Sequence, residues 1–95
     1  MKFQWDPVKS ETNVKKHGVS FDEAETVFED ERAVTVYDDS HSGDEDRFNI
    51  IGISRKLREL MVCYCYRNGE NITRIISARK ATKRESAIYE RGMKV

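Results

Sequence analysis

The residues best suited to chemistry are cations that gather near the end of the chain. Five of them fall within eleven positions: Arg74, Arg79, Lys80, Lys83 and Arg84. Arg79 stands where a predicted strand runs into a predicted helix, and the free N–H groups at a helix start favour an anion such as phosphate beside a guanidinium. The alternative, which composition alone favours, is that these cations only form a solvated basic helix face.

A second candidate lies earlier in the chain, where Lys16 and His17 precede Gly18. Gly18 marks the C-terminal end of a predicted helix, and the helix dipole favours a cation there. His17 could therefore carry a proton for a reaction. A histidine near a helix cap is, however, more often a structural hydrogen-bond donor, so both interpretations stay open.

Metal and nucleotide chemistry have no support in the sequence. The glycine-rich phosphate loops, the zinc-protease motif and the hydrolase nucleophile motif are all missing. Cys63 and Cys65 lie on one face of a predicted strand with Cα atoms about 6.6 Å apart, too far for an easy disulfide, and are expected as buried thiols. The acidic segment 38–46 lacks the ligand order of a calcium loop, so no metal and no cofactor is expected.

The elements that must position these residues follow from hydrophobic periodicity and turn signals. Together they predict one α+β domain over residues 1–95, with a small, mostly antiparallel sheet packed by two N-terminal helices and one C-terminal helix. The predicted strands cover Phe3–Trp5, Ala33–Tyr37, Arg47–Ser54, Glu59–Tyr66 and Ile72–Ala78. The predicted helices cover residues 8–16, 21–28 and 82–91.

Local signals give finer expectations. Ser20 with Glu23 and Thr82 with Glu85 have the spacing of capping boxes at the starts of the second and third helices. The pair Asn68-Gly69 favours a type I′ hairpin turn between the last two strands. Strict alternation on the last strand puts Thr73, Ile75, Ser77 and Arg79 on one face and Ile72, Arg74, Ile76 and Ala78 on the other.

Composition limits the class of protein. The chain has 17 Lys/Arg and 17 Asp/Glu, but residues 1–47 hold 6 and 13 of these, net −7, and residues 48–95 hold 11 and 4, net +7. A basic half could attract a polyanion, or the two halves could simply neutralise each other. The longest apolar run, Leu60–Tyr66, is too short to span a membrane, and Met1–Pro7 lacks a signal-peptide pattern, so the cytoplasm is expected.

Four motifs occur in a characteristic order: Trp5-Asp6-Pro7, residues 13–24, residues 47–52, and residues 76–85 followed by Tyr89. They resemble the BrnT family, the toxins of type II toxin-antitoxin modules. The resemblance implies a RelE-like fold and a ribonuclease that arrests translation. It also implies a BrnA-like antitoxin with a ribbon-helix-helix domain, in a heterotetramer of two toxins on an antitoxin dimer. DNA would be bound only through that antitoxin.

Cleavage of this kind would use attack by the 2′-hydroxyl on the adjacent phosphate, with a base, an acid and cations but no cofactor. Arg79 is assigned to the developing charge, and His17 and Glu85 are candidates for the proton transfers, although Glu85 could only cap its helix. Further phosphate contacts are expected from Arg47, Arg55, Arg84 and Lys16. The rival hypothesis is a non-catalytic module that binds its partner and adjusts transcription of its own operon.

Overall fold

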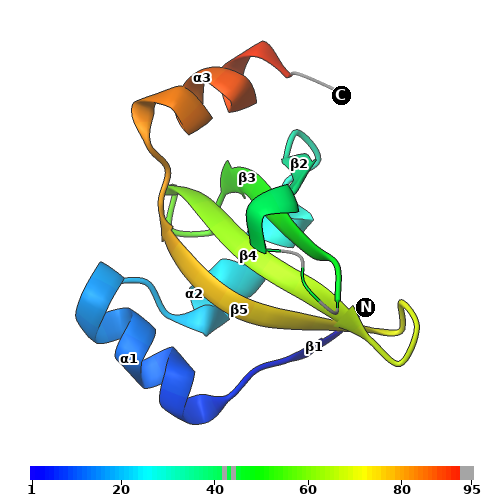
Figure 1. Ribbon diagram of the computed structural model, residues 1–95. Coiled ribbons are helices and arrows are strands. Elements are labelled where there is room, and N and C mark those ends of the chain that lie inside the picture. Colours follow the sequence, from blue (N-terminus) through cyan, green and yellow to red (C-terminus); the bar gives the residue numbers. More distant parts are fainter. Residues whose placement is uncertain (42, 44, 93–95) are drawn as a thin grey trace.

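One five-stranded sheet organises the molecule in the computed structural model, which describes residues 1–41, 43 and 45–92 (Figure 1). The strand order is β1-β5-β4-β3-β2. The strands are β1 (Lys2–Gln4), β2 (Val34–Tyr37), β3 (Arg47–Ile53), β4 (Glu59–Arg67) and β5 (Ile72–Lys80). Only β1 pairs in parallel, with β5, so the prediction of a mostly antiparallel α+β sheet is confirmed.

Three helices accompany the sheet, also as predicted. They are α1 (Pro7–His17), α2 (Phe21–Thr26), which continues as the 3₁₀ turn η1 (Val27–Glu29), and α3 (Lys83–Arg91). Asp6 caps α1 by accepting from the N–H of Val8, and Gly18 ends it in the left-handed conformation. Figure 1 shows α2 behind the sheet, α1 beside β5 and α3 beyond one end of the sheet. The sheet face opposite α2, which we call the open face, carries none of these three helices.

The core lies between α2 and the sheet. Val19, Phe21, Ala24 and Val27 are fully buried against five sheet residues: Leu60, Val62, Tyr64, Ile75 and Ala78. Burial of each large apolar side chain contributes about 1.5–3 kcal/mol. These contacts fix the helix-covered face of β4 and β5.

A buried polar residue holds α1, which is mostly polar. The Asn13 amide donates to the carbonyl oxygens of Val19 and Ala78, at 2.7 and 2.8 Å, and accepts from the N–H of Ala78 at 3.2 Å. Asn13 is thus satisfied although it is only 6% exposed. Because Ala78 precedes Arg79, these bonds place the end of α1 near the end of β5.

A β-bulge changes the faces of β5. Cys63 pairs with Ser77, but the next β4 residue, Tyr64, pairs with Ile75, so Ile76 is an extra residue. Arg74 consequently pairs with Cys65 and shares the open face with Ser77 and Arg79. The predicted alternation, with Arg74 opposite to Arg79, was wrong because a residue pattern does not reveal an inserted residue.

The hairpin after β4 contains the predicted Asn-Gly pair. Asn68 and Gly69 take positive φ angles of 53° and 68°, as a type I′ turn requires. Strand pairing nevertheless resumes only between Arg67 and Ile72, and the N–H of Asn71 bonds to the carbonyl of Asn68. The connection therefore has four residues, 68–71: the Asn-Gly pair turns the chain as predicted, but strand pairing does not close directly around it.

The acidic segment between β2 and β3 passes in front of the sheet (Figure 1). It contains the 3₁₀ turn η2 (Asp39–His41), and positions 42 and 44 lie outside the described residues. Beneath it, Cys63 and Cys65 are free and buried, as predicted. Among the residues that the structure describes, no helix has the length and apolar character needed to cross a membrane.

Candidate functional site

A two-pronged ion pair joins the end of β5 to the start of α3. Arg79 Nη1 lies 2.8 Å from Glu85 Oε1, and Arg79 Nη2 lies 2.9 Å from Glu85 Oε2. Thr82 begins α3 with a complete capping box: its hydroxyl accepts from the N–H of Glu85, and its own N–H donates to the Glu85 carboxylate. The predicted box is confirmed, and the same carboxylate that caps the helix also holds Arg79.

Both members of this pair are charged at neutral pH. Burial raises the pKa of Glu85, but the bonds from Arg79 and from the Thr82 N–H more than offset this and leave it below its ordinary value. The bond to Glu85 raises the pKa of Arg79. The pair is only partly buried, with side-chain exposures of 35% for Arg79 and 20% for Glu85. A phosphate presents two oxygens as a carboxylate does, so it can compete with Glu85 for the guanidinium.

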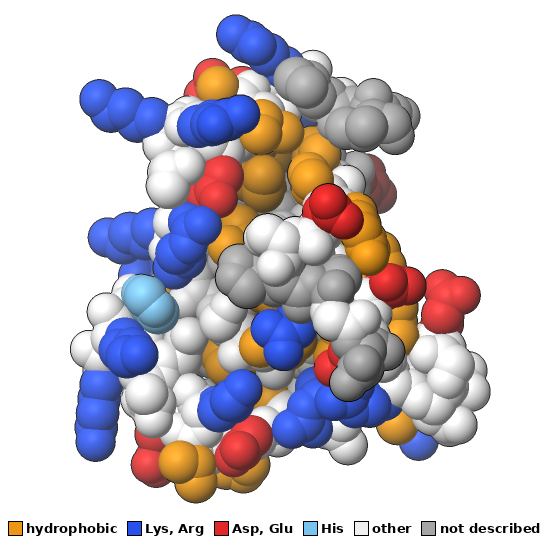
Figure 2. Space-filling view, in the orientation of Figure 1, with side chains coloured by type: hydrophobic (Ala, Val, Ile, Leu, Met, Phe, Trp, Pro, Cys, Tyr) orange, Lys and Arg blue, Asp and Glu red, His pale blue; other side chains and the backbone are white. Residues whose placement is uncertain are grey.

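Three other predicted residues lie near this end of the sheet. Lys16 and His17 are exposed in the last turn of α1, one turn after Asn13, which bonds to the neighbour of Arg79. Arg84 is exposed in the first turn of α3, next to Glu85. Figure 2 shows Lys and Arg side chains along the edge that runs from α3 past the end of β5 to α1.

Arg47 lies on the open face but farther along it. It pairs with Cys65, whereas Arg79 pairs with Met61, so the two arginines share a face and are separated by four positions of β4. That separation corresponds to about 13 Å at the usual rise of a strand. Arg47 and Arg79 therefore lie on the same surface of the sheet, but beside β4 residues that are not adjacent to each other.

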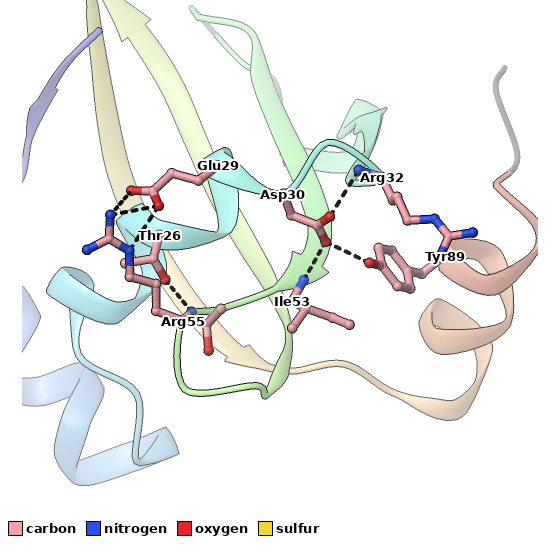
Figure 3. Close-up of a pocket in the computed structure, with 8 residues that line it drawn as sticks. Thr26, Glu29, Asp30, Arg32, Ile53, Arg55 and Tyr89 are labelled. Carbon is pink, nitrogen blue, oxygen red and sulfur yellow. Dashed lines mark hydrogen bonds and ion pairs between the residues drawn. The ribbon is translucent and has the colours of Figure 1, made fainter.

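Arg55 lies elsewhere. Its guanidinium donates to both carboxylate oxygens of Glu29, at 2.9 and 3.1 Å, and its N–H donates to the Thr26 hydroxyl (Figure 3). Both partners belong to the helix-covered side. Arg55 therefore lies away from the open face that carries Arg47, because Glu29 draws it toward η1.

A cavity of about 360 Å³ separates α3 from the η1 turn. Its lining residues are Thr26, Glu29, Asp30, Arg32, Ile53, Ser54, Arg55 and Tyr89. Figure 3 shows Tyr89 and Ile53 converging on Asp30, whose Oδ2 accepts from the phenol at 2.7 Å and from the Ile53 N–H at 2.8 Å.

The bonds to Asp30 connect α3 to the end of η1 at this cavity. Burial and the Asp30 carboxylate raise the pKa of Tyr89 to about 12, so the phenol remains a donor at neutral pH. Tyr89 therefore anchors α3 to η1 and β3, and through α3 it positions Glu85. The sequence pattern gave Asp30 no role, because a surface acid and a hydrogen-bond hub look alike in a sequence.

A second Arg-Glu pair was not predicted. Arg58 Nε donates to Glu23 Oε2 at 2.9 Å, Arg58 Nη2 also bonds to Glu23, and the Ser54 hydroxyl donates to the same carboxylate at 2.7 Å. The bond from Arg58 is the main cause that lowers the pKa of Glu23. Ser20 accepts from the Glu23 N–H, but the Glu23 carboxylate turns to Arg58 instead, so only half of the predicted capping box forms.

The open face also carries two further arginines, of which only Arg74 belongs to the cation cluster noted in the sequence. Arg74 Nη1 donates to Gln4 Oε1 at 2.9 Å, and Arg67 pairs with Glu45 and donates to Cys65 Sγ. Within the described part of the chain, Asn49 Oδ1 is a buried oxygen without a hydrogen-bond partner. No three His, Cys, Asp or Glu side chains of the described residues lie close enough together to hold a metal.

Comparison with known proteins agrees with this geometry. The family described as "Ribonuclease toxin, BrnT, of type II toxin-antitoxin system" matches residues 5–85. Among solved structures, the Brucella abortus ribonuclease toxin BrnT is similar, with a TM-score of 0.68 and 28% identity, covering 87% of this chain and 99% of that chain. No curated protein sequence matches. With the family matched over most of its length, the chain belongs to the BrnT ribonuclease toxins of type II toxin-antitoxin systems.

Proposed function

We propose that this toxin cleaves RNA at the Arg79–Glu85 pair, by attack of a ribose 2′-hydroxyl and without a metal. The observation that carries the proposal is the two-pronged grip of Glu85 on a partly exposed Arg79, at the edge of a face that also holds Arg47 and Arg74. The proposal is supported by this grip, because it orients Arg79 toward two adjacent oxygens, as a phosphate would present them.

The RNA phosphate replaces Glu85 between the prongs of Arg79. Arg79 then stabilises the negative charge that develops on the non-bridging oxygens during the reaction. Once released from Arg79, Glu85 loses the bonds from Arg79 that help to lower its pKa and becomes a better base. It remains held near the site by the N–H of Thr82.

The reaction forms one bond and breaks one. The 2′-oxygen attacks phosphorus and passes its proton to the base, for which we propose Glu85. The bond from phosphorus to the 5′-oxygen breaks, and that oxygen takes a proton from the acid, for which we propose His17. The products are a 2′,3′-cyclic phosphate and a 5′-hydroxyl. Arg47, Arg84 and Lys16 are proposed as phosphate contacts, and Arg55 is omitted because Glu29 holds it on the other side.

The experiment compares two arginines that each grip a glutamate. Purified protein is incubated with single-stranded RNA in EDTA, and the products are separated on a gel. Arg79→Ala is expected to slow cleavage by about 10²–10³-fold, the usual cost of removing a donor to a developing negative charge. Arg55→Ala removes the equivalent grip on Glu29 and should leave the rate unchanged.

Two results would oppose the proposal. Equal rates for Arg79→Ala and the wild type would remove Arg79 from the chemistry. Intact RNA after incubation with a wild-type protein that still binds its partner would favour the non-catalytic binding module instead.

The partner that we propose is a BrnA-like ribbon-helix-helix antitoxin, in a heterotetramer of two toxins on an antitoxin dimer. The support for this partner is the toxin-antitoxin family itself, since a ribonuclease that arrests translation must be inhibited in the cell that makes it. A basic face is most simply covered by an acidic or apolar segment of another chain. Binding to DNA would come through the antitoxin. Co-purification, with the complex mass measured by light scattering, tests the stoichiometry.

A further inference from the structure

The bulge at Ile76 gives the open face a cation that strict alternation would have put on the other face. Without the extra residue, Arg74 would point to the helix-covered face, among the core side chains. With it, Arg74 lies beside Cys65 in the row that Arg47 occupies on the other side of β4. Bulges commonly redirect a side chain beside a functional site.

Among the residues that the structure describes, Arg74 has a neutral hydrogen-bond partner, so its charge is not paired. Arg74 donates to the neutral amide of Gln4, whereas Arg67 pairs with Glu45, Arg55 with Glu29 and Arg58 with Glu23. A neutral partner orients the guanidinium without cancelling its field. The hydrogen bond to Gln4 is solvent-exposed, so an anion can reach this side chain.

Arg74 and Arg79 lie too far apart to bind the same phosphate. Arg79 pairs with Met61 and Arg74 with Cys65, four positions along β4, or about 13 Å at the usual rise of a strand. One phosphate cannot bridge that distance. The strand residue between these rows is Ser77, which pairs with Cys63 and offers a small polar surface. An anion at Arg74 must therefore belong to a different linkage from the one at Arg79.

We propose that Arg74 binds a second phosphate of the RNA strand whose cleaved linkage lies at Arg79, so that the RNA backbone follows β5. The inference rests on the proposed ribonuclease function and extends it: the substrate is a strand with several phosphates, held at two points of the open face. Arg74 contributes to binding and leaves the chemical step to the Arg79–Glu85 end.

The test measures binding of a ten-nucleotide 2′-O-methyl RNA, which lacks the attacking hydroxyl, by fluorescence anisotropy over a range of salt concentrations. Each neutralised phosphate of a single strand contributes about −0.7 to the slope of log K against log salt. Arg74→Ala is expected to reduce the steepness of the slope by about 0.7, and Arg74→Lys should restore most of it. Cleavage assays should show a raised KM for Arg74→Ala with kcat unchanged.

Two matched variants separate charge from structure. Gln4→Ala removes the same internal hydrogen bond but keeps the cation, so its slope should equal the wild-type slope. Arg32→Ala removes one charge from an exposed position beside the α3 cavity and should also leave the slope unchanged.

The outcomes are distinct. An Arg74→Ala slope equal to that of the wild type, or a Gln4→Ala slope as shallow as that of Arg74→Ala, overturns the inference and leaves the ribonuclease proposal standing. A wild-type protein that neither binds this RNA nor cleaves its 2′-hydroxyl counterpart overturns both.

Discussion

Two Arg-Glu pairs in this molecule begin from nearly the same sequence signal and end in different environments. Glu23 and Glu85 both stand three residues after a helix-capping hydroxyl, and both bind an arginine through two oxygens. Glu23 is buried and has Ser54 as a further partner, whereas Glu85 remains partly exposed and keeps its capping bond.

The comparison shows how a structural pair differs from the pair that we propose to be reactive. In the first pair Arg58 is 30% exposed, but the Glu23 carboxylate is buried and has a further hydrogen bond, so an anion does not readily displace it and removal of Arg58 leaves an uncompensated charge. A partly exposed pair at the end of a strand can exchange its carboxylate for a phosphate at little cost. We therefore expect variants of the two pairs to differ in the property that they change.

The largest expected effect is on stability. Arg58→Ala leaves the Glu23 carboxylate buried without its cation and should lower the free energy of unfolding by about 3–5 kcal/mol, measured by urea denaturation. The control is Arg55→Ala, whose pair with Glu29 is exposed and should cost less than about 1 kcal/mol. A loss for Arg58→Ala no greater than that for Arg55→Ala would contradict the structural role.

Lysine at the two arginine positions sharpens the contrast. Arg79→Lys keeps the charge but loses one of the two charged hydrogen bonds, worth about 1.5–3 kcal/mol, so cleavage should slow by about 10–100-fold while the unfolding midpoint barely moves. Arg58→Lys should do the reverse, with a lower unfolding midpoint and normal cleavage by the remaining folded protein. Similar losses of activity in both variants would erase the distinction.

Low pH should lower the free energy of unfolding through both glutamates, Glu23 and Glu85. The folded-state pKa of Glu23 lies below its ordinary value of 4.5, so its stabilising contribution is complete above that pH and disappears as the pH falls through the folded-state value. Glu85 has the same sign. Unfolding measured between neutral pH and pH 3 should show a weaker pH dependence in Glu23→Gln than in the wild type, with Glu85→Gln between them. A wild-type curve that is flat below pH 4.5 would refute this.

The smallest effects concern the caps. Ser20→Ala and Thr82→Ala should each cost about 1 kcal/mol of stability, because each removes one capping hydrogen bond. Only Thr82→Ala should also lower cleavage, by a few-fold, since Thr82 helps to hold the residue that we propose as the base. Cleavage rates at a temperature where both variants are fully folded provide the measurement.

The elements of this fold could be predicted from sequence because each has a local cause. Pro7 and Gly18 mark the ends of α1, the Thr82 box starts α3, and alternating apolar residues define the strands. The bulge at Ile76 and the four-residue hairpin could not be predicted in this way. Both depend on how two strands pair, and a short stretch of sequence does not contain that information.

The same limit applies to the candidate site. The position of Arg79 at a strand end could be inferred from sequence, and so could the spacing of Glu85, but their mutual grip depends on the turn between β5 and α3. The partners Glu23 with Arg58 and Asp30 with Tyr89 are 35 and 59 positions apart. One sequence contains no signal for such distant pairs.

The bonds between Asn13 and Ala78 have a consequence for biosynthesis. They join positions 65 residues apart, and β1 near the start of the chain pairs with β5 near its end. While the chain is growing on the ribosome, α1 and β1 cannot form their contacts with β5 until β5 has been synthesised. Arg79 lies at the end of β5 and Glu85 in α3, so the proposed cleavage site assembles only after both elements have been synthesised.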